Sequence, residues 1–324
     1  MNKIPTISVI IPVKNEGTKI RACIEGILSQ TIPVTEIIVI DSGSTDDTLS
    51  ILKEFSIVKV IEIPGSEFNH GATRNLGVRN ATGEFLLFTV GDARAYDNLW
   101  IEHMLKGFDG DDNIAGVCGL QIVPHERDKN PAEWFRPASK PQIVKHVYTE
   151  EEFNALTPFE KKVACSWDDV TTMYKRDIML NKVPFQPTTY GEDILWAKDA
   201  IRAGYAIVYN TAARVYHYHL EDGEFTFKRS FTVIYHWYKL WDYVTEVPEF
   251  NLMYYLKLAN VLRKAEGLSA SEKIKWWKYN LELKAAIKKA IVEFHKSLQA
   301  GEDNLDKRHT ELCGKPPIPK KQLA

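Results

Sequence analysis

Short apolar runs alternate with amphipathic segments over the first part of the chain. The runs at 7–13 and 36–40 are rich in β-branched residues and show no apolar–polar alternation, which is typical of strands buried on both faces of a parallel sheet. We expect strands at 7–13, 36–40, 58–63 and 84–89, separated by helices at 20–28, 46–55 and 73–81. This order predicts an α/β fold with a doubly wound, mostly parallel sheet.

The pattern changes twice further along the chain. Between about 110 and 220 it is mixed, and after 224 apolar residues recur at helical spacing, with a capping box at Ser269 and Glu272. We expect strands at 117–123, 205–209 and 213–217, a polar loop at 125–162 and a helix at 194–202. The predicted organisation is an α/β domain over 1–223, a helical extension over 224–300 and a loose tail over 301–324.

Composition excludes several classes of protein. The formal net charge of the 324 residues is -2, which argues against a nucleic-acid partner. The four cysteines lie far apart without a C-x-x-C pair, so we expect no thiolate metal site, no disulfide framework and a reducing cytoplasm. No apolar run is long enough to span a membrane, and the N-terminal segment lacks a cleavage site. Any membrane role is therefore expected to be peripheral.

Polar residues follow the first two predicted strands. Residues 12–16 follow the first strand, and Asp41 ends the second. Ligands of such sheets bind beyond the carboxyl ends of the strands, where a carboxylate accepts hydrogen bonds from a base or a ribose hydroxyl. The alternative is local, because Ser44, Thr45 and Asp46 are all suited to cap a helix. Neither strand is followed by G-x-G-x-x-G, which argues against a dinucleotide site.

Arg74 and Asp92 are the next candidates for a ligand site. Arg74 lies near the start of a predicted helix, where its planar fork suits a diphosphate; the alternative is a solvated surface arginine. Asp92 follows the 84–89 strand, so its carboxylate is expected at the same sheet edge. One carboxylate and a diphosphate together can hold Mg²⁺ or Mn²⁺. The alternative for Asp92 is a turn residue.

These segments, in this order, resemble the family 2 glycosyltransferases with the GT-A fold. The resemblance spans about residues 5–230 and rests on 8–15 (SVIIPVKN), 41–46 (DSGSTD), 71–77 (GATRNLG), 81–84 (ATGE), Asp92 and 190–193 (YGED). The segments 68–71 (FNHG), 217–219 (HYH) and 227–229 (FKR) are most similar to the rhamnosyltransferase branch.

The resemblance implies a nucleotide-sugar half at about 1–95 and an acceptor half at about 96–223. The residues it places around the nucleoside and diphosphate are Pro12, Val13, Asn15, Glu16, Asp41, Ser44 and Arg74. Asp92 matches the last Asp of the family's D-x-D metal motif, whose first Asp is replaced by Val90, so a requirement for Mg²⁺ or Mn²⁺ stays open.

The acidic pair at 192–193 matches the residues that supply the family's general base. The base removes the proton of the acceptor hydroxyl, and we assign this role to Asp193 before Glu192. The alternative is that both acids only favour the first turn of a helix. His217, and less so His219, is a candidate for the metal or a phosphate, although core and surface histidines are more common. Residues 167–169 are candidates for the acceptor side.

The resemblance implies an inverting glycosyltransferase that uses dTDP-rhamnose or a UDP-sugar. The acceptor would be a hydroxyl of a glycan or of a lipid-linked intermediate. The alternatives are a nucleotidyltransferase and a catalytically weakened nucleotide-sugar-binding protein. Residues 257–296 contain ten Lys/Arg and four Glu with interleaved aromatics. They predict either a packing or homo-oligomer surface or a peripheral contact with the inner face of the membrane.

Overall fold

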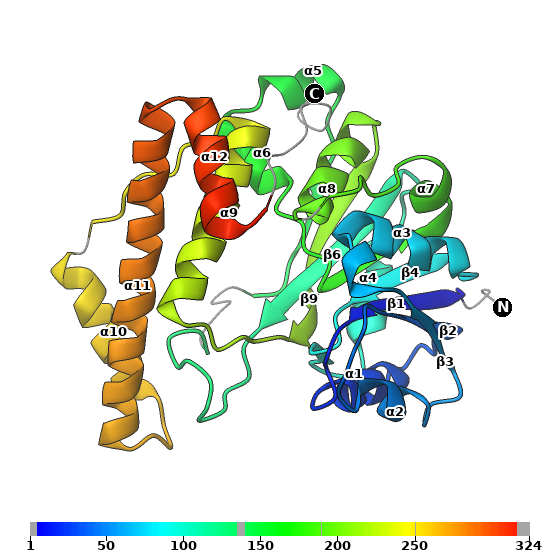
Figure 1. Cartoon of the computed structure of the whole chain (residues 1–324). Helices are drawn as coiled ribbons and strands as arrows, with labels where there is room; N and C mark the ends of the chain where they lie inside the picture. The colour runs from blue at the N-terminus through cyan, green and yellow to red at the C-terminus, as the bar shows by residue number, and fades with distance from the viewer. Residues whose placement is uncertain (1–4, 135–139, 189, 250, 316–324) are drawn as a thin grey trace. The chain divides into compact units, whose positions relative to one another are not determined.

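The computed structural model describes residues 5–134, 140–188, 190–249 and 251–315. The chain forms two compact units: unit 1 holds residues 1–122 and 139–217, and unit 2 holds 123–138 and 218–324 (Figure 1). The expected boundary at 223 therefore differs from the observed one. Residues 123–138 belong with the helices because Trp134 packs in their core and Asn130 exchanges hydrogen bonds with Asn280.

Unit 1 is built on one nine-stranded mixed sheet. Its path order is β3 (Val58–Glu62), β2 (Glu36–Asp41), β1 (Ile7–Val13), β4 (Phe85–Thr89), β8 (Thr171–Lys175), β6 (Ile114–Ile122), β9 (Ala206–Tyr216) and β5 (Arg94–Ala95), and β7 (Ile143–His146) pairs with β9. The four strands from β3 to β4 are parallel, as predicted. β8 runs antiparallel to both of its neighbours, and β9 is parallel to β6. The two segments predicted at 205–209 and 213–217 form the single strand β9.

Helices cover both faces of this sheet. They are α1 (Ile20–Leu28), α2 (Thr48–Leu52), α3 (His70–Asn80), α4 (Trp100–Lys106), α5 (Glu150–Ala155), α6 (Pro158–Ala164), α7 (Arg176–Asn181) and α8 (Glu192–Arg202). Residues of odd number in β1 pack with α1 in one buried cluster. On the other face, a Cβ on Gly77 of α3 would lie 2.5 Å from a methyl of Ile10. Glycine thus lets α3 approach the sheet closely.

The prediction of a polar loop over 125–162 is wrong for part of its second half, from 143 onward. It contains β7, α5 and α6. The two helices each begin with a complete capping box, Thr149 with Glu152 and Thr157 with Glu160. Reciprocal capping fixes the helix starts in spite of the polar composition.

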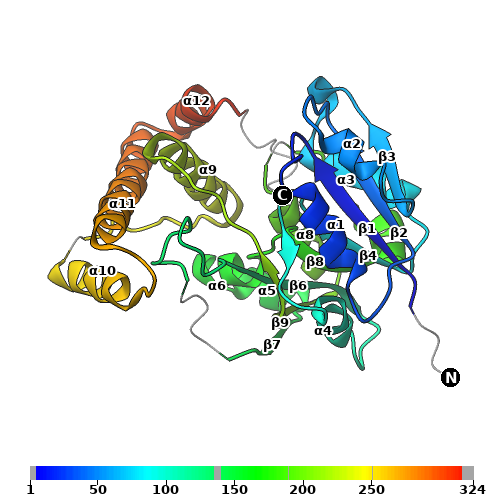
Figure 2. The same ribbon diagram turned by 90° about the horizontal axis from the view of Figure 1, so that it is seen from below.

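Unit 2 is helical, with α9 (Gly223–Trp241), α10 (Leu252–Lys264), α11 (Ala270–Gln299) and α12 (Glu302–Cys313). α11 lies along α9 in both views (Figures 1 and 2), and the predicted capping box at its start is present. The tail expected to be loose from 301 is instead helical as far as Cys313, because Leu305 and His309 are buried against the other helices. Residues 316–324 lie outside the described residues. Within the described part of the chain, every helix is too short or too polar to cross a bilayer.

Candidate active site

The predicted site residues of unit 1 come together at one edge of its sheet. β1, β2, β4, β6 and β9 all point the same way, since β8 is antiparallel to the strands on either side of it. Their carboxyl ends therefore share an edge with the start of β8. Pro12–Glu16, Asp41, Asp92, Asp169 and His217 stand at or next to these ends.

The loops after β1 and β2 are cross-linked by hydrogen bonds. Asp41 Oδ2 accepts from the backbone N–H groups of Gly43 and Ser44, both at 2.9 Å. Ser44 Oγ accepts from the N–H of Asn15 at 2.8 Å, and Asn15 Oδ1 accepts from that of Thr45. Asn15 has a φ of 58°, a left-handed conformation that these contacts hold in place.

The two side-chain oxygens of Asp41 differ in their contacts. Its side chain is buried, and Oδ1 has no hydrogen-bond partner among the described residues. Buried carboxylate oxygens are rarely left without a donor. The local alternative for this loop is not met, because the N-cap residue of α2 is Asp47 and no side chain makes the cap hydrogen bond. Asp46 accepts instead from the N–H of Thr48, the first residue of the helix.

Glu16 links the first loop to the end of β4. Its N–H donates to Thr48 Oγ1 at 2.8 Å, and a Cβ on Gly91 would lie 2.9 Å from Glu16 Cγ. Glycine at 91 therefore leaves room for the Glu16 side chain beside Asp92. Burial and the neighbouring Asp92 raise the pKa of the Glu16 carboxyl above its usual value. The nearby residue Val13 is a core residue whose carbonyl accepts from Ser42, and Pro12 is half-buried.

Arg74 lies in a buried cluster, so its interpretation as a solvated surface arginine is wrong. Its NH1 group is 2.8 Å from Glu192 Oε1, and Nε is 3.0 Å from Asp169 Oδ2. Asp169 also accepts a hydrogen bond from the Tyr174 hydroxyl. His70 Nδ1 is 3.7 Å from the same Glu192 oxygen. We call Arg74, Asp168, Asp169, Glu192 and Asp193 the arginine cluster.

Contacts between α3 and the chain before α8 create this cluster. Asn75 of α3 donates to the Phe185 carbonyl and accepts from the Phe185 N–H. Asn69 Oδ1 accepts from Ala72, as the helix cap, and from Thr188. A Cβ on Gly71 would come within 1.9 Å of the Gln186 carbonyl oxygen, so only glycine fits there. Together these contacts hold the start of α8 beside Arg74.

The pKa values of the two acids at the start of α8 are shifted in opposite directions. Burial alone would raise the pKa of Glu192, but Arg74 and His70 outweigh it and lower this pKa to about 2. Burial raises the pKa of Asp193 well above its usual value, and the charges of Glu192 and Asp169 raise it further. Asp169 responds in the same direction, with a pKa raised to about 7 mainly by burial. The acids of the cluster outnumber its one guanidinium, which is why the neighbouring charges raise the pKa of Asp193 and Asp169.

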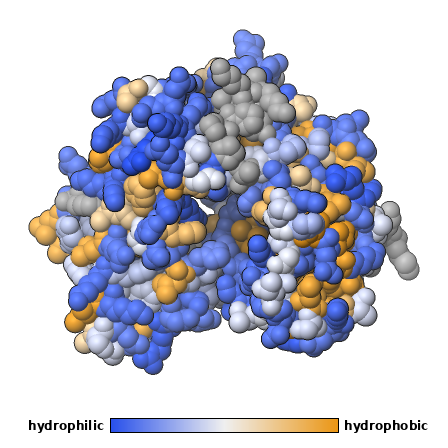
Figure 3. Space-filling model, in the orientation of Figure 1, coloured by the Kyte–Doolittle hydropathy of each residue, from blue (hydrophilic) through white to orange (hydrophobic). Residues whose placement is uncertain are grey.

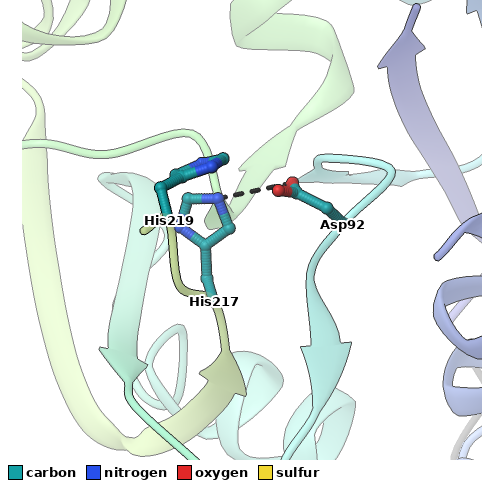
Figure 4. Close-up of side chains that lie close together, drawn as sticks. All are labelled: Asp92, His217 and His219. Carbon is teal, nitrogen blue, oxygen red and sulfur yellow. Dashed lines mark ion pairs between the residues drawn. The ribbon is translucent and has the colours of Figure 1, made fainter. Parts of the chain in front are cut away.

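Asp92 and His217 form a second group, which we call the Asp92 cluster. β5 starts two residues after Asp92 and pairs with the end of β9, which brings Asp92 to His217. His217 Nε2 is 3.3 Å from Asp92 Oδ1, and Lys19 Nζ is 3.2 Å from Asp92 Oδ2. His219 follows two residues later, and one ligand atom from each of Asp92, His217 and His219 lies within 4.8 Å of the others (Figure 4).

Gln121 connects the Asp92 cluster to the arginine cluster. Its Nε2 group donates to Asp168 Oδ2, which as a carboxylate can only accept, so Oε1 faces His217 Nδ1. With this amide orientation His217 Nδ1–H donates to Gln121 Oε1, and Nε2 is the ring nitrogen that faces Asp92. Metal-binding histidines commonly donate their other ring N–H in this way.

The sequence indicated most of these residues but not all their partners. Asp92 with His217, and Arg74 with Glu192, are brought into contact. Asp169 was expected on the acceptor side and proves to be a partner of Arg74. Lys19 and Gln121 were missed, because a single Lys or Gln carries no motif and their contacts span 73 and 96 positions of the chain.

Known proteins are similar in sequence to this chain. Residues 8–166 match the sequence profile described as Glycosyl transferase family 2. The O-antigen chain rhamnosyltransferase RfbN of Salmonella typhimurium is 33% identical over 237 residues, which cover 71% of this chain and 72% of that protein. The O-antigen chain rhamnosyltransferase WbaN of Salmonella anatum is 32% identical over 241 residues, covering 72% of each chain.

Solved structures share the fold. The mannosyltransferase PcManGT from Pyrobaculum calidifontis, in complex with GDP-Man and Mn²⁺, superposes with a TM-score of 0.54 at 17% identity, covering 96% of this chain and 80% of that one. TarS 1–349 from S. aureus, in complex with UDP-GlcNAc, gives a TM-score of 0.52 at 17% identity, covering 98% and 82%. The chain belongs to glycosyltransferase family 2: it is a glycosyltransferase with the GT-A fold, related to the O-antigen rhamnosyltransferases.

Proposed function

We propose that unit 1 transfers a sugar from a nucleoside-diphosphate donor to a hydroxyl acceptor with inversion at the anomeric carbon. One observation carries the proposal. The unpartnered Asp41 oxygen and the Asp92 cluster belong to one edge of the sheet, and Asp193 with its raised pKa belongs to the arginine cluster, whose Asp169 lies just before β8 at that edge. This reaction needs three groups together: a hydrogen-bond acceptor for the nucleoside, a site for a cation, and a general base.

The loops after β1 and β2 suit the nucleoside. Asp41 Oδ1 can accept from a base N–H or a ribose hydroxyl, while Pro12, Val13, Asn15, Glu16 and Ser44 shape the surrounding loop surface. The sugar is proposed to be rhamnose carried by dTDP, because the relatives described above are named rhamnosyltransferases. A UDP-sugar is the alternative donor.

Asp92 and His217 fit Mg²⁺ or Mn²⁺. A carboxylate oxygen and an imidazole nitrogen suit Mn²⁺, while Mg²⁺ prefers oxygen. The Gln121 contact directs His217 Nε2 toward Asp92. Val90 supplies no carboxylate, so phosphate oxygens of the donor would complete the coordination. The ion would supply positive charge that stabilises the departing diphosphate.

Asp193 is the better base of the acidic pair. A base must hold a proton with an affinity matched to its task, and the pKa of Asp193 is raised whereas that of Glu192 is about 2. Asp193 takes the proton of the acceptor hydroxyl as that oxygen bonds to the anomeric carbon. The bond from this carbon to the phosphate oxygen breaks on the opposite face, which inverts the configuration.

Arg74 acts on the acids more than on the donor. Its guanidinium already contacts Glu192 and Asp169. We therefore assign it to holding the start of α8, with the developing charge of the diphosphate as a second, longer-range partner. Glu192 then helps raise the pKa of Asp193 by its own negative charge.

Replacing the base tests the proposal directly. Asp193→Asn should lower kcat by about 10²- to 10⁴-fold, the usual range for losing a general base. Binding of dTDP or UDP by calorimetry should not change, because Asp193 lies outside the nucleoside loops. NMR of the glycosidic product from the wild type should show the anomeric configuration opposite to that of the donor. An unchanged kcat or a retained configuration would overturn the mechanism.

The surface of α10 suits a peripheral membrane contact. Leu252, Met253 and Leu256 are 73%, 56% and 53% exposed, while Leu258 and Leu262 on the other face are buried. Figure 3 shows hydrophobic residues at the surface over α10, at the left of the view. Within its bounds α10 has three basic residues and no acidic one.

Charge favours anionic lipid as the partner of this face. The ten basic and four acidic residues of 257–296 give this segment six positive charges, against -2 for the whole chain. Basic residues beside an apolar face increase binding to anionic lipid surfaces. We place the enzyme at the cytoplasmic face of a membrane, where a lipid-linked acceptor would be met.

Vesicle sedimentation tests this location. The triple variant Leu252→Ser, Met253→Ser, Leu256→Ser should lose binding to vesicles with anionic lipid. The control Ile143→Ser removes a similarly exposed residue from β7 of unit 1 and should bind as the wild type does. Unchanged binding of the triple variant would contradict the membrane contact. If light scattering shows a dimer for the wild type and the Ile143→Ser control but a monomer for the triple variant, this face is an oligomer surface instead.

A further inference from the structure

Lys19 is a partly exposed cation on a nearly buried carboxylate. It precedes the first residue of α1 and its side chain makes no helix-cap hydrogen bond. Its Nζ group lies 3.2 Å from Asp92 Oδ2, and the two side chains are 48% and 5% exposed. The ammonium can therefore leave into solvent, whereas the carboxylate stays at the sheet edge.

Both oxygens of Asp92 already face a nitrogen. Oδ1 faces His217 Nε2 at 3.3 Å and Oδ2 faces Lys19 Nζ. The imidazole can share Asp92 with a metal ion, because a ring nitrogen is itself a metal ligand. The ammonium cannot, since it has no lone pair and repels a divalent cation at this distance.

We infer that Lys19 is an exchangeable counter-ion of Asp92, which a divalent metal displaces and which then binds a phosphate of the donor. This rests on the metal site of the proposed function. The displaced ammonium is held near Asp92 by α1, so a diphosphate on the metal comes within its reach. An ammonium on a flexible stem is a common phosphate partner.

Linkage gives the exchange a thermodynamic signature. Metal binding releases Lys19 for the diphosphate, and the diphosphate draws Lys19 away from Asp92. Each ligand therefore strengthens the other, by the same factor in both directions. When nucleotide is absent, Lys19 weakens metal binding. When metal is bound, Lys19 strengthens the binding of nucleotide.

The size of the effect follows from the exposure of the pair. Ion pairs with an exposed partner contribute little, and the burial of Asp92 places this one at the upper end of their range. We expect removal of the ammonium to tighten metal binding about three- to tenfold when nucleotide is absent.

The experiment measures free Mn²⁺ by electron paramagnetic resonance, without any assay of activity. The variant Lys19→Met keeps the length of the side chain and removes its charge. The matched control Arg21→Met removes one positive charge from the same helix, where Arg21 pairs with Glu54 at 2.6 Å. Lys19→Met should bind Mn²⁺ about three- to tenfold more tightly than the wild type, and Arg21→Met should not differ from it.

A second measurement uses dTDP and UDP at saturating Mn²⁺. Lys19→Met should bind the better of the two nucleotides about three- to tenfold more weakly, while Arg21→Met keeps the wild-type affinity. Equal Mn²⁺ affinities of Lys19→Met, Arg21→Met and wild type would overturn the exchange but leave the metal site standing. Mn²⁺ binding by wild type no stronger than by Asp92→Asn would instead overturn the metal site, and the exchange with it.

Discussion

The two charged clusters of unit 1 are built in opposite ways. In the arginine cluster one guanidinium lies among carboxylates, and Arg74, Asp169 and Glu192 are all buried. In the Asp92 cluster one carboxylate lies between nitrogens, and Lys19 is half exposed. The difference in exposure determines what each cluster can do. A buried cluster is fixed and shifts the pKa of its members, whereas an open one can exchange its cation for another.

The largest expected effect is on the buried guanidinium. Arg74→Met leaves Glu192 and Asp169 without their countercharge, so we expect the free energy of unfolding to fall by about 3 to 5 kcal/mol. Urea denaturation measures it. Lys19→Met, which removes the cation of the open cluster, should cost at most about 1 kcal/mol. If Arg74→Met and Lys19→Met lower the free energy of unfolding equally, the two clusters do not differ in this respect.

Gln121 joins the clusters, and its replacement should weaken the metal. Gln121→Leu removes the acceptor that fixes the His217 ring, so we expect Mn²⁺ affinity to fall about 10- to 100-fold. Gln121→Glu keeps an acceptor for His217 Nδ1, so it should lose less Mn²⁺ affinity than Gln121→Leu, although its carboxylate repels Asp168. If both variants bind Mn²⁺ as tightly as the wild type, the tautomer of His217 does not depend on Gln121.

A further expected effect is a pH dependence of stability. The pKa of Asp169 is about 7 in the folded protein, above its ordinary value of 3.8. The folded state then holds the proton more tightly, so stability from this group is present below pH 3.8 and is lost as the pH rises to 7. Glu192 acts oppositely, and its stability is lost only as the pH falls from 4.5 toward 2.

Asp169→Asn separates these contributions. It should flatten the fall in stability between about pH 4 and 7, measured by urea denaturation at a series of pH values. Asp92→Asn changes the open cluster and should leave that slope as it is. A slope that follows Asp92 and not Asp169 would reverse the assignment of the two clusters.

The sequence could predict the site where it depends on strand order. Asp41 and Asp92 follow parallel strands, so their common edge follows from β-α-β chirality alone. It could not predict that Arg74 meets Asp169, because this depends on β8 running antiparallel beside β4 and on Gly71 fitting against Gln186. The helices α5 and α6 were a different kind of failure. The residues of their capping boxes are visible in the sequence, although the polar composition of the segment is typical of a loop.

The amide of Gln121 also gives the site a direction. His217 Nδ1 donates to Gln121 Oε1, and Gln121 Nε2 donates to Asp168, so the two hydrogen bonds run in one direction and leave Nε2 of the ring facing Asp92. Turning that amide by half a revolution would reverse this direction and place a proton between His217 and Asp92, where an ion would otherwise enter. The orientation of one side-chain amide therefore decides whether Nδ1 of His217 donates a hydrogen bond or accepts one while Nε2 faces Asp92, without any backbone movement.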